Sequence, residues 1–208
     1  MTSRFDEMAA SWDEDPQKVE RACAVARQIR CHVALDPEMK ALEFGCGTGL
    51  LSFALKDDLG HITLVDNSPG MLDVLERKIA AGAVKNMTPL LLDLTSGGKG
   101  VREKFDIVFT MMALHHIPQP ASVLSVLFSL LNDGGYLAVA ELEKGDTLFH
   151  GAGFGEHDGF SRKELSIMAQ NAGFGLVCFC DCFTIRRKIE GVVENFNVFL
   201  MLCRKNGG

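Results

Sequence analysis

Short apolar runs alternate with segments of helical periodicity through the first two thirds of the chain. Five β-rich runs predict strands: four at about 40–44, 61–66, 105–110 and 136–141, and one, third in order, that ends with residues 90–93. Between them, apolar residues recur every three or four positions, which predicts helices over about 50–56, 69–81 and 121–131. This alternation is typical of a parallel sheet whose strands are joined by right-handed helical crossovers.

The first 35 residues precede this pattern and have one of their own. Asp15 and Pro16 suit the N-cap and first position of a helix, and apolar residues at helical spacing extend it over 16–34. Before that helix lies a polar, acidic leader that contains Phe5 and Trp12. We expect residues 1–35 to form an N-terminal lid and helix, followed by a core over 40–145.

After residue 145 the pattern changes again. A Gly- and His-rich stretch leads to Ser161 and Glu164, which form a capping box that opens a helix to about 172. Two β-rich runs, 176–185 and 196–203, are joined by a charged loop and predict an antiparallel pair. We therefore expect 1–208 to form a single α/β domain, in which 146–208 adds a helix and a β-hairpin to a mostly parallel, seven-stranded sheet.

Composition and charge argue against some classes of binding partner. The 208 residues carry a net charge of -6 with no long basic run, which argues against a nucleic-acid partner. No apolar run is long enough to span a bilayer, and the first seven residues lack the apolar core of a signal peptide. Seven scattered cysteines suit reduced thiols. We expect a cytoplasmic protein without a membrane partner, and the sequence leaves its oligomeric state open.

The segment that follows the first strand has the strongest chemical signal. An acid, Glu43, precedes three glycines at alternate positions, Gly45, Gly47 and Gly49, and an apolar helical segment follows. Glycine permits positive φ and close approach of a ligand to the backbone, and the helix N-terminus behind it presents free N–H groups. Such a turn suits a nucleotide-like or carboxylate-bearing ligand at the carboxyl end of a parallel strand.

The glycine spacing differs from the G-x-G-x-x-G of dinucleotide sites. The pattern Glu-x-Gly-x-Gly-x-Gly resembles motif I of the class I (Rossmann-like) S-adenosylmethionine-dependent methyltransferases, and four ordered motifs extend the resemblance over about residues 3–145. It implies a three-layer Rossmann-like fold, S-adenosylmethionine as cofactor and S-adenosylhomocysteine as product. It also implies methyl transfer to an unidentified acceptor, which we expect to be a small molecule.

The resemblance assigns candidate cofactor-binding residues. Asp66, 21 residues after Gly45 at the end of the second strand, suits an acceptor for both ribose hydroxyls, although a solvated loop acid is the alternative. Asp93 would face the adenine amino group or act as a turn cap, and Met71 would pack on the adenine or in the core. The full set predicted to bind the cofactor is Trp12, Glu43, Gly45, Cys46, Gly47, Asp66, Asn67, Met71, Asp93, Leu94, Met111 and His116.

Three of these assignments have specific alternatives. Glu43 would either tie the glycine turn through backbone N–H groups or approach the ammonium group of the ligand. Trp12 and Phe5 resemble a leader that folds over the cofactor as a lid, and an arm packed on the core is equally compatible. Met111 and His116 lie in the segment that, by resemblance, passes the methionine part of the cofactor.

No catalytic residue is assigned from the sequence. His115, His116 or His157 could deprotonate an acceptor, but a structural role is favoured for the adjacent pair because methyl transfer need not use a base. The absence of an Asn/Asp-Pro-Pro-aromatic sequence after the fourth strand argues against methylation of base amino groups. His150 with His157 provides too few ligands for a metal. Cys178, Cys180 and Cys182 alternate along a strand and suit buried small hydrophobes.

Two other functions stay open. A nicotinamide-dependent oxidoreductase is disfavoured by the glycine spacing and by the lack of a Tyr-x-x-x-Lys pair, since the only tyrosine is Tyr136 in a predicted strand. A non-catalytic protein that binds S-adenosylmethionine and acts as a partner is the second. Binding of NAD and transfer of labelled methyl groups would separate these possibilities.

Overall fold

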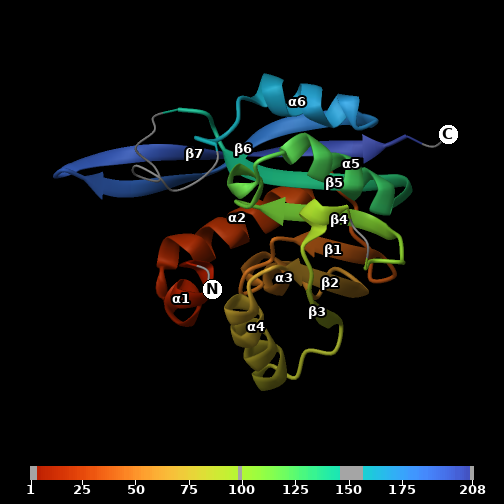
Figure 1. The fold of residues 1–208 in the computed structure, drawn as a ribbon, viewed down its shortest axis with the longest axis horizontal. Coiled ribbons are helices and arrows are strands. Elements are labelled where there is room, and N and C mark those ends of the chain that lie inside the picture. The colour runs from red at the N-terminus through yellow and green to blue at the C-terminus, as the bar shows by residue number, and fades with distance from the viewer. Residues whose placement is uncertain (1–3, 98–99, 146–156, 207–208) are drawn as a thin grey trace.

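The computed structural model describes residues 4–97, 100–145 and 157–206 and has the expected α/β architecture (Figure 1). The N-terminal part contains α1 (Arg4–Met8), the 3-10 helix η1 (Ala9–Glu14) and α2 (Pro16–His32). The alternating part contains β1 (Lys40–Phe44), α3 (Leu50–Leu55), β2 (His61–Asp66), α4 (Pro69–Ala81), β3 (Met87–Leu91), η2 (Leu94–Ser96), β4 (Phe105–Met111), η3 (Leu114–His116), α5 (Pro120–Leu130) and β5 (Leu131–Leu142). The last part contains α6 (Arg162–Asn171), β6 (Phe174–Ile189) and β7 (Val192–Lys205).

The strands form one seven-stranded sheet in the order β3-β2-β1-β4-β5-β7-β6. The first five strands are parallel, and β7 pairs antiparallel with both β5 and β6. This confirms the predicted mostly parallel sheet with a C-terminal antiparallel hairpin. Because the chain order reverses between β1 and β4, their carboxyl ends border a crevice of the kind that binds ligands in open α/β sheets.

Two apolar clusters cover the two faces of the sheet. On one face, residues of α2, α3 and α4 pack on Ala41, Ile62 and Ile107. On the other face, residues of α5 and α6 pack on the alternate positions Leu42 and Val108. The alternation of side chains along each strand sends neighbouring residues to opposite layers, which produces three layers from one continuous apolar pattern. The expected division of the domain into 1–35, 40–145 and 146–208 stays a prediction.

The third strand ends two residues earlier than predicted. It covers Met87–Leu91 and so ends at Leu91, not at Asp93, which follows it as the N-cap of η2. The strand lies at the sheet edge, and its residues beyond Met87 are half-buried or exposed. The sequence is therefore weakly apolar at the start of the strand. It is most apolar at Leu90, Leu91 and Leu92, which lie at the end of the strand and just after it.

The prediction of a charged loop between the last two strands is wrong. β6 and β7 continue through it to a tight turn at Glu190 and Gly191, which have φ values of 49° and 90°. In Figure 1 this part of the hairpin projects beyond the rest of the sheet, on the left. A ribbon that projects into solvent does not need an apolar face, so its charged sequence resembles that of a loop. Among the described residues, no helix combines the length and apolarity needed to cross a membrane.

Candidate functional site

The carboxyl ends of the parallel strands border a pocket with a volume of about 550 Å³. This is within the range of roughly 300–1,000 Å³ that is typical of small-molecule sites. Its walls come from the leader, the start of α2, the turn after β1, the ends of β2 and β4, the segment around η2, and β6. All twelve residues predicted to bind the cofactor line this pocket: Trp12, Glu43, Gly45, Cys46, Gly47, Asp66, Asn67, Met71, Asp93, Leu94, Met111 and His116.

The turn after β1 requires glycine for two different reasons. Gly45, Gly47 and Gly49 all have positive φ, at 66°, 53° and 78°. A Cβ at Gly45 would lie 2.6 Å from the Cβ of Ala113, so this position must also be small because β4 and its following turn press against it. A Cβ at Gly47 would meet only the Sδ of Met71, at 3.8 Å, so the backbone there faces open space in the pocket.

Asp66 holds this turn against the end of β2. Its Oδ2 accepts the N–H of Gly47 at 2.7 Å, and its Oδ1 accepts the N–H of Ser68 at 2.9 Å. Burial raises the pKa of Asp66, and the backbone N–H donors oppose that effect. The carboxylate therefore lies inside the crevice between the glycine turn and the start of α4, and the exposed Asn67 follows at the pocket wall.

Asp93, Leu94 and Met71 border the pocket on the β3 side. Asp93 is exposed, and its Oδ1 accepts the backbone N–H of Thr95 at 2.9 Å, so it does act as a turn cap. Leu94 is buried, and Met71 is 2% exposed and belongs to the packed face of α4. For Met71 the two sequence interpretations are therefore compatible, because a core residue also forms part of the wall.

Glu43 is buried at the back of the glycine turn. Its Oε2 accepts the N–H of Ser52 at 3.2 Å and also the hydroxyl proton of Ser52, so it ties β1 to α3 and not to the glycines themselves. Burial raises the pKa of Glu43 to about 8 despite these donors. One sequence interpretation had Glu43 bound to backbone N–H groups of the glycine turn, whereas its backbone donor in the structure belongs to the helix that follows.

The leader is fastened to the pocket by two acids whose partners the sequence did not reveal. Asp6 accepts the hydroxyl of Ser68 at 2.6 Å and the N–H of Gly70 at 2.9 Å, at the start of α4. Asp13 accepts the hydroxyl of Thr48 at 2.5 Å and contacts Lys78 at 2.5 Å. Between these two anchors, the rings of Phe5 and Trp12 lie 6.2 Å apart and line the pocket.

A buried histidine–carboxylate pair supports the segment after β4. The Nδ1 of His115 lies 2.7 Å from the Oε2 of Glu141 at the end of β5, and both side chains are at most 1% exposed. Burial raises the pKa of Glu141, but the facing His115 outweighs this and holds it below the ordinary value. The neighbouring His116 lines the pocket, and its ring centroid is 5.1 Å from that of Phe5.

The remaining candidates have structural contacts. His157 donates its backbone N–H to the carbonyl of His115, and its Nε2 lies 3.0 Å from the carbonyl of Ile117. It therefore supports the backbone of η3 and of the residue that follows it. His150 and the glycines around it lie outside the described residues. Cys178, Cys180 and Cys182 pack against the core, and no group of metal ligands is present in 4–97, 100–145 and 157–206.

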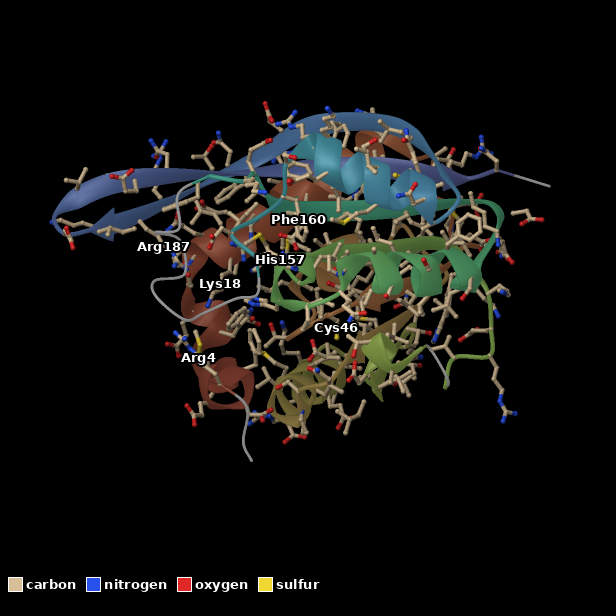
Figure 2. The ribbon with its side chains drawn as sticks, turned by 45° about the horizontal axis from the view of Figure 1, so that its top comes forward. Arg4, Lys18, Cys46, His157, Phe160 and Arg187 are labelled. Atoms are coloured by element: carbon tan, nitrogen blue, oxygen red, sulfur yellow. The ribbon has the colours of Figure 1, made fainter. Side chains whose placement is uncertain are left out.

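The main feature that the sequence did not predict is a set of cations on the opposite wall. Lys18 and Arg21 of α2 and Arg187 of β6 line the pocket together with Arg4 (Figure 2). Their positions in the sequence are up to 183 residues apart, so no local pattern could have grouped them. The only local signal is the spacing of Lys18 and Arg21, which puts both on one face of α2.

Comparison with known proteins agrees with this geometry. Residues 42–137 match the family model described as a methyltransferase domain. An uncharacterized methyltransferase of Schizosaccharomyces pombe is 32% identical over 149 residues, 64% of this chain and 52% of that protein. A ubiquinone biosynthesis O-methyltransferase of Xanthomonas campestris is 32% identical over 143 residues, 66% of this chain and 58% of that protein. The chain thus spans about half the length of these curated relatives.

Solved structures share the fold. The N-methyltransferase NodS from Bradyrhizobium japonicum, in complex with S-adenosylhomocysteine, superposes with a TM-score of 0.71. The superposition covers 94% of this chain and 90% of NodS, at 16% sequence identity. At that identity the likeness concerns the fold alone.

Proposed function

We propose that this chain is a class I (Rossmann-like) methyltransferase that transfers the methyl group of S-adenosylmethionine to a small-molecule acceptor. The observation that carries the proposal is the carboxylate of Asp66, held 2.7 Å from the N–H of Gly47 inside the crevice. A fixed acid at the end of β2, next to a glycine turn at the end of β1, is the arrangement that binds an adenosine ribose in doubly wound folds.

The residues present fit this cofactor. The open backbone of Gly47 would receive its amino-acid end. The carboxylate of Asp66 would accept the ribose hydroxyls, while Asp93 would face the adenine amino group, with Leu94 and Met71 as apolar walls. Each of these parts lies at the carboxyl edge in the order β1, β2, β3, which matches an elongated nucleoside laid across the strands.

When bound, the cofactor would supply an electrophilic methyl group on sulfur, and the acceptor that takes this group would release its proton to water or a nearby base. The main contribution of this chain is to position the two reactants. The glycine turn and Asp66 fix one reactant, and Phe5, Trp12 and His116 narrow the space around it. Holding two reactants in line is worth several orders of magnitude in rate, and exclusion of water prevents loss of the methyl group.

A nicotinamide-dependent oxidoreductase has less support. The glycines follow an alternate spacing, and Tyr136 is not among the residues that line the pocket. A non-catalytic protein that binds the same cofactor would share every feature of the cofactor half of the pocket, so only a transfer assay separates it from an enzyme. A cytoplasmic location and a small-molecule acceptor remain part of this proposal.

Calorimetric titration with S-adenosylhomocysteine and with NAD tests the cofactor. We expect binding of the first and none of the second. Asp66→Ala removes an acceptor of at least one charge-assisted hydrogen bond, so the affinity should fall by about tenfold or more. Asp73→Ala, an exposed acid on α4 that does not line the pocket, is the matched control and should bind like the unmodified chain.

The melting temperature of each variant separates loss of the ligand contact from loosening of the turn. Unchanged affinity in a folded Asp66→Ala variant, or tight binding of NAD alone, contradicts the proposal. Transfer of labelled methyl groups to a metabolite extract then distinguishes the enzyme from the non-catalytic alternative.

A further inference from the structure

Met112, the residue that follows β4, has a backbone conformation that its side chain disfavours. Its φ is 58°, in the left-handed region that a residue of its size rarely adopts. Two other non-glycine residues of the described chain have a positive φ, Ala83 and Glu190, each at 49°. Ala83 follows the end of α4 and Glu190 lies in the hairpin turn, so both belong to chain reversals. Met112 lies instead at the carboxyl end of a central strand, and backbone strain in such a place is commonly retained for function.

Contacts on both sides hold Met112 in this conformation. Its N–H donates to the carbonyl of Ala140 in β5 at 2.8 Å, so the pairing of the two strands continues one residue past β4. The next residue, Ala113, presses against the glycine turn, because a Cβ at Gly45 would lie 2.6 Å from that of Ala113. The strained residue therefore lies between two fixed backbone contacts.

The left-handed residue changes which side chains reach the pocket. Met111, Met112 and Ala113 all line it, although they are consecutive. In a regular strand, successive side chains point to opposite faces, so only alternate residues would reach one cavity. The conformation of Met112 breaks this alternation and adds its own side chain to the wall.

Met112 borders the part of the pocket that lies beyond the proposed cofactor site. In the proposed binding mode the nucleoside lies across β1, β2 and β3, whereas β4 is on the opposite side of β1 in the sheet. The wall continues from there to Ile185 of β6, and Met112 packs against the apolar cluster to which Ile185 belongs. Ile117, which follows η3, also lines the pocket. A second ligand on this side would therefore meet mainly apolar side chains of β4, β6 and the segment after η3.

The cations of α2 that line the pocket are compensated within the protein. The carboxylate of Asp15 lies 4.0 Å from the Nζ of Lys18, which also lies 3.7 Å from the centroid of the Trp12 ring. Burial lowers the pKa of Arg21 to about 10, and the carboxylates of Asp15 and Glu141 act against this shift. A ligand on this side does not need a negative charge, so its fit depends on the apolar residues.

We propose that Met112 selects the methyl acceptor, and that the acceptor has an uncharged, apolar body that packs on this side chain. The inference rests on the proposed methyl transfer and names an acceptor class for the same pocket. An unbranched thioether suits this role, because it is apolar and adapts its shape to the ligand. Each CH₂ group that a ligand buries there should raise its affinity by about fourfold.

The test uses phenol, 4-ethylphenol and 4-butylphenol as probes, titrated into the chain saturated with S-adenosylhomocysteine and into the free chain. We expect the affinity to rise by about two- to fourfold for each added CH₂. Met112→Leu keeps an apolar side chain of similar size and should keep this increase. Met112→Asn tolerates a positive φ but is polar, so the increase should be largely lost. Ala83→Asn, at an exposed position with positive φ that does not line the pocket, is the matched control and should behave like the unmodified chain.

The affinity for S-adenosylhomocysteine separates selection of the acceptor from a role in the fold or in the cofactor site. We expect Met112→Asn to bind S-adenosylhomocysteine as tightly as the unmodified chain does. A parallel loss of affinity for S-adenosylhomocysteine and for the phenols overturns the proposal, because Met112 would then support the whole site. Equal affinities for the three phenols, no binding of any of them, or an unchanged increase in Met112→Asn overturns it as well. If Met112→Asn does not fold, Met112→Gly gives the same comparison, since it removes the side chain and the strain together.

The two proposals fail separately. Failure of S-adenosylhomocysteine to bind counts against the proposed methyl transfer. The phenol series in the free chain still tests selection by Met112, because the contacts that hold this residue come from β5 and the glycine turn.

Discussion

The buried pair of His115 and Glu141 allows a stability prediction with a defined size. His115→Ala leaves the carboxylate of Glu141 inside the protein, where it keeps two backbone donors among the described residues, the N–H of residue 115 at 3.3 Å and that of Leu142 at 3.1 Å. Removing one partner of a buried ion pair costs about 3–5 kcal/mol. We therefore expect the free energy of unfolding at pH 7 to fall by roughly that amount.

The penalty of the stranded charge has an upper limit. The stranded carboxyl can take up a proton, and pH 7 lies about 2.5 pH units above the ordinary value of 4.5. At 1.36 kcal/mol per unit, protonation costs about 3 kcal/mol, so the penalty of the stranded charge does not exceed that figure. Any additional loss comes from the favourable interaction with His115, which holds the pKa of Glu141 below its ordinary value, and from the cavity left by the imidazole ring.

The pH dependence gives a sharper signature than the size. In the unmodified chain the pKa of Glu141 is lowered, so the stability it contributes is present above about pH 4.5 and is lost as the pH falls through the lower value of the folded state. In His115→Ala, burial without the partner raises that pKa above the unfolded value. The variant should therefore gain stability as the pH falls from 7 towards 5.

Urea unfolding between pH 5 and pH 8 measures both effects. His115→Ala combined with Glu141→Gln removes the stranded charge and should recover most of the loss that is due to charge. A variant that loses less than about 1 kcal/mol and keeps the pH profile of the unmodified chain would refute the reasoning, because the carboxylate would then not depend on His115.

Two other substitutions test the glycine turn and its support. The pKa of Glu43 is raised to about 8, so its ionisation lowers the stability of the unmodified chain as the pH rises from about 4.5 to 8. Glu43→Gln should remove this decrease in the free energy of unfolding, as measured by urea unfolding, and the exposed Glu38→Gln should not. Gly45→Ala combines positive φ with a Cβ 2.6 Å from that of Ala113, whereas Gly191→Ala has positive φ and open space. Gly191→Ala should cost about 1–2 kcal/mol and Gly45→Ala about 1–3 kcal/mol more, and equal losses would show that the turn moves freely away from Ala113.

Local features of the sequence were sufficient to predict the side of the pocket that is formed by the ends of β1 and β2. Glu43 and Asp66 lie at the ends of apolar runs that are strands, the glycines follow the first of them, and parallel strands bring their carboxyl ends to one edge without further information. The element boundaries of β1, β2 and α4 follow the sequence pattern closely for the same reason. The fold class and the position of the crevice could thus be predicted from periodicity and turn residues.

The opposite half of the pocket depends on contacts that no local pattern encodes. Gln17 binds Arg186 across 169 residues, and Asp6 binds Gly70 across 64. His115 and Glu141 are 26 residues apart, and neither flanking sequence indicates a partner. Side chains that meet only through tertiary packing leave no periodicity in the sequence, and that is why the cations on α2 and β6 could not be grouped in advance.

The sheet order has a consequence for how the chain assembles during synthesis. The last strand to be made, β7, lies between β5 and β6, so β6 has no neighbour in the sheet until β7 has been inserted. The hydrogen bond between Gln17 and Arg186 therefore forms only after almost the whole chain has been translated, although α2 is among the first helices to be made. The crevice at the ends of β1 and β2 can form before the wall that faces it, so a nascent chain halted before β7 would have only part of the pocket lining.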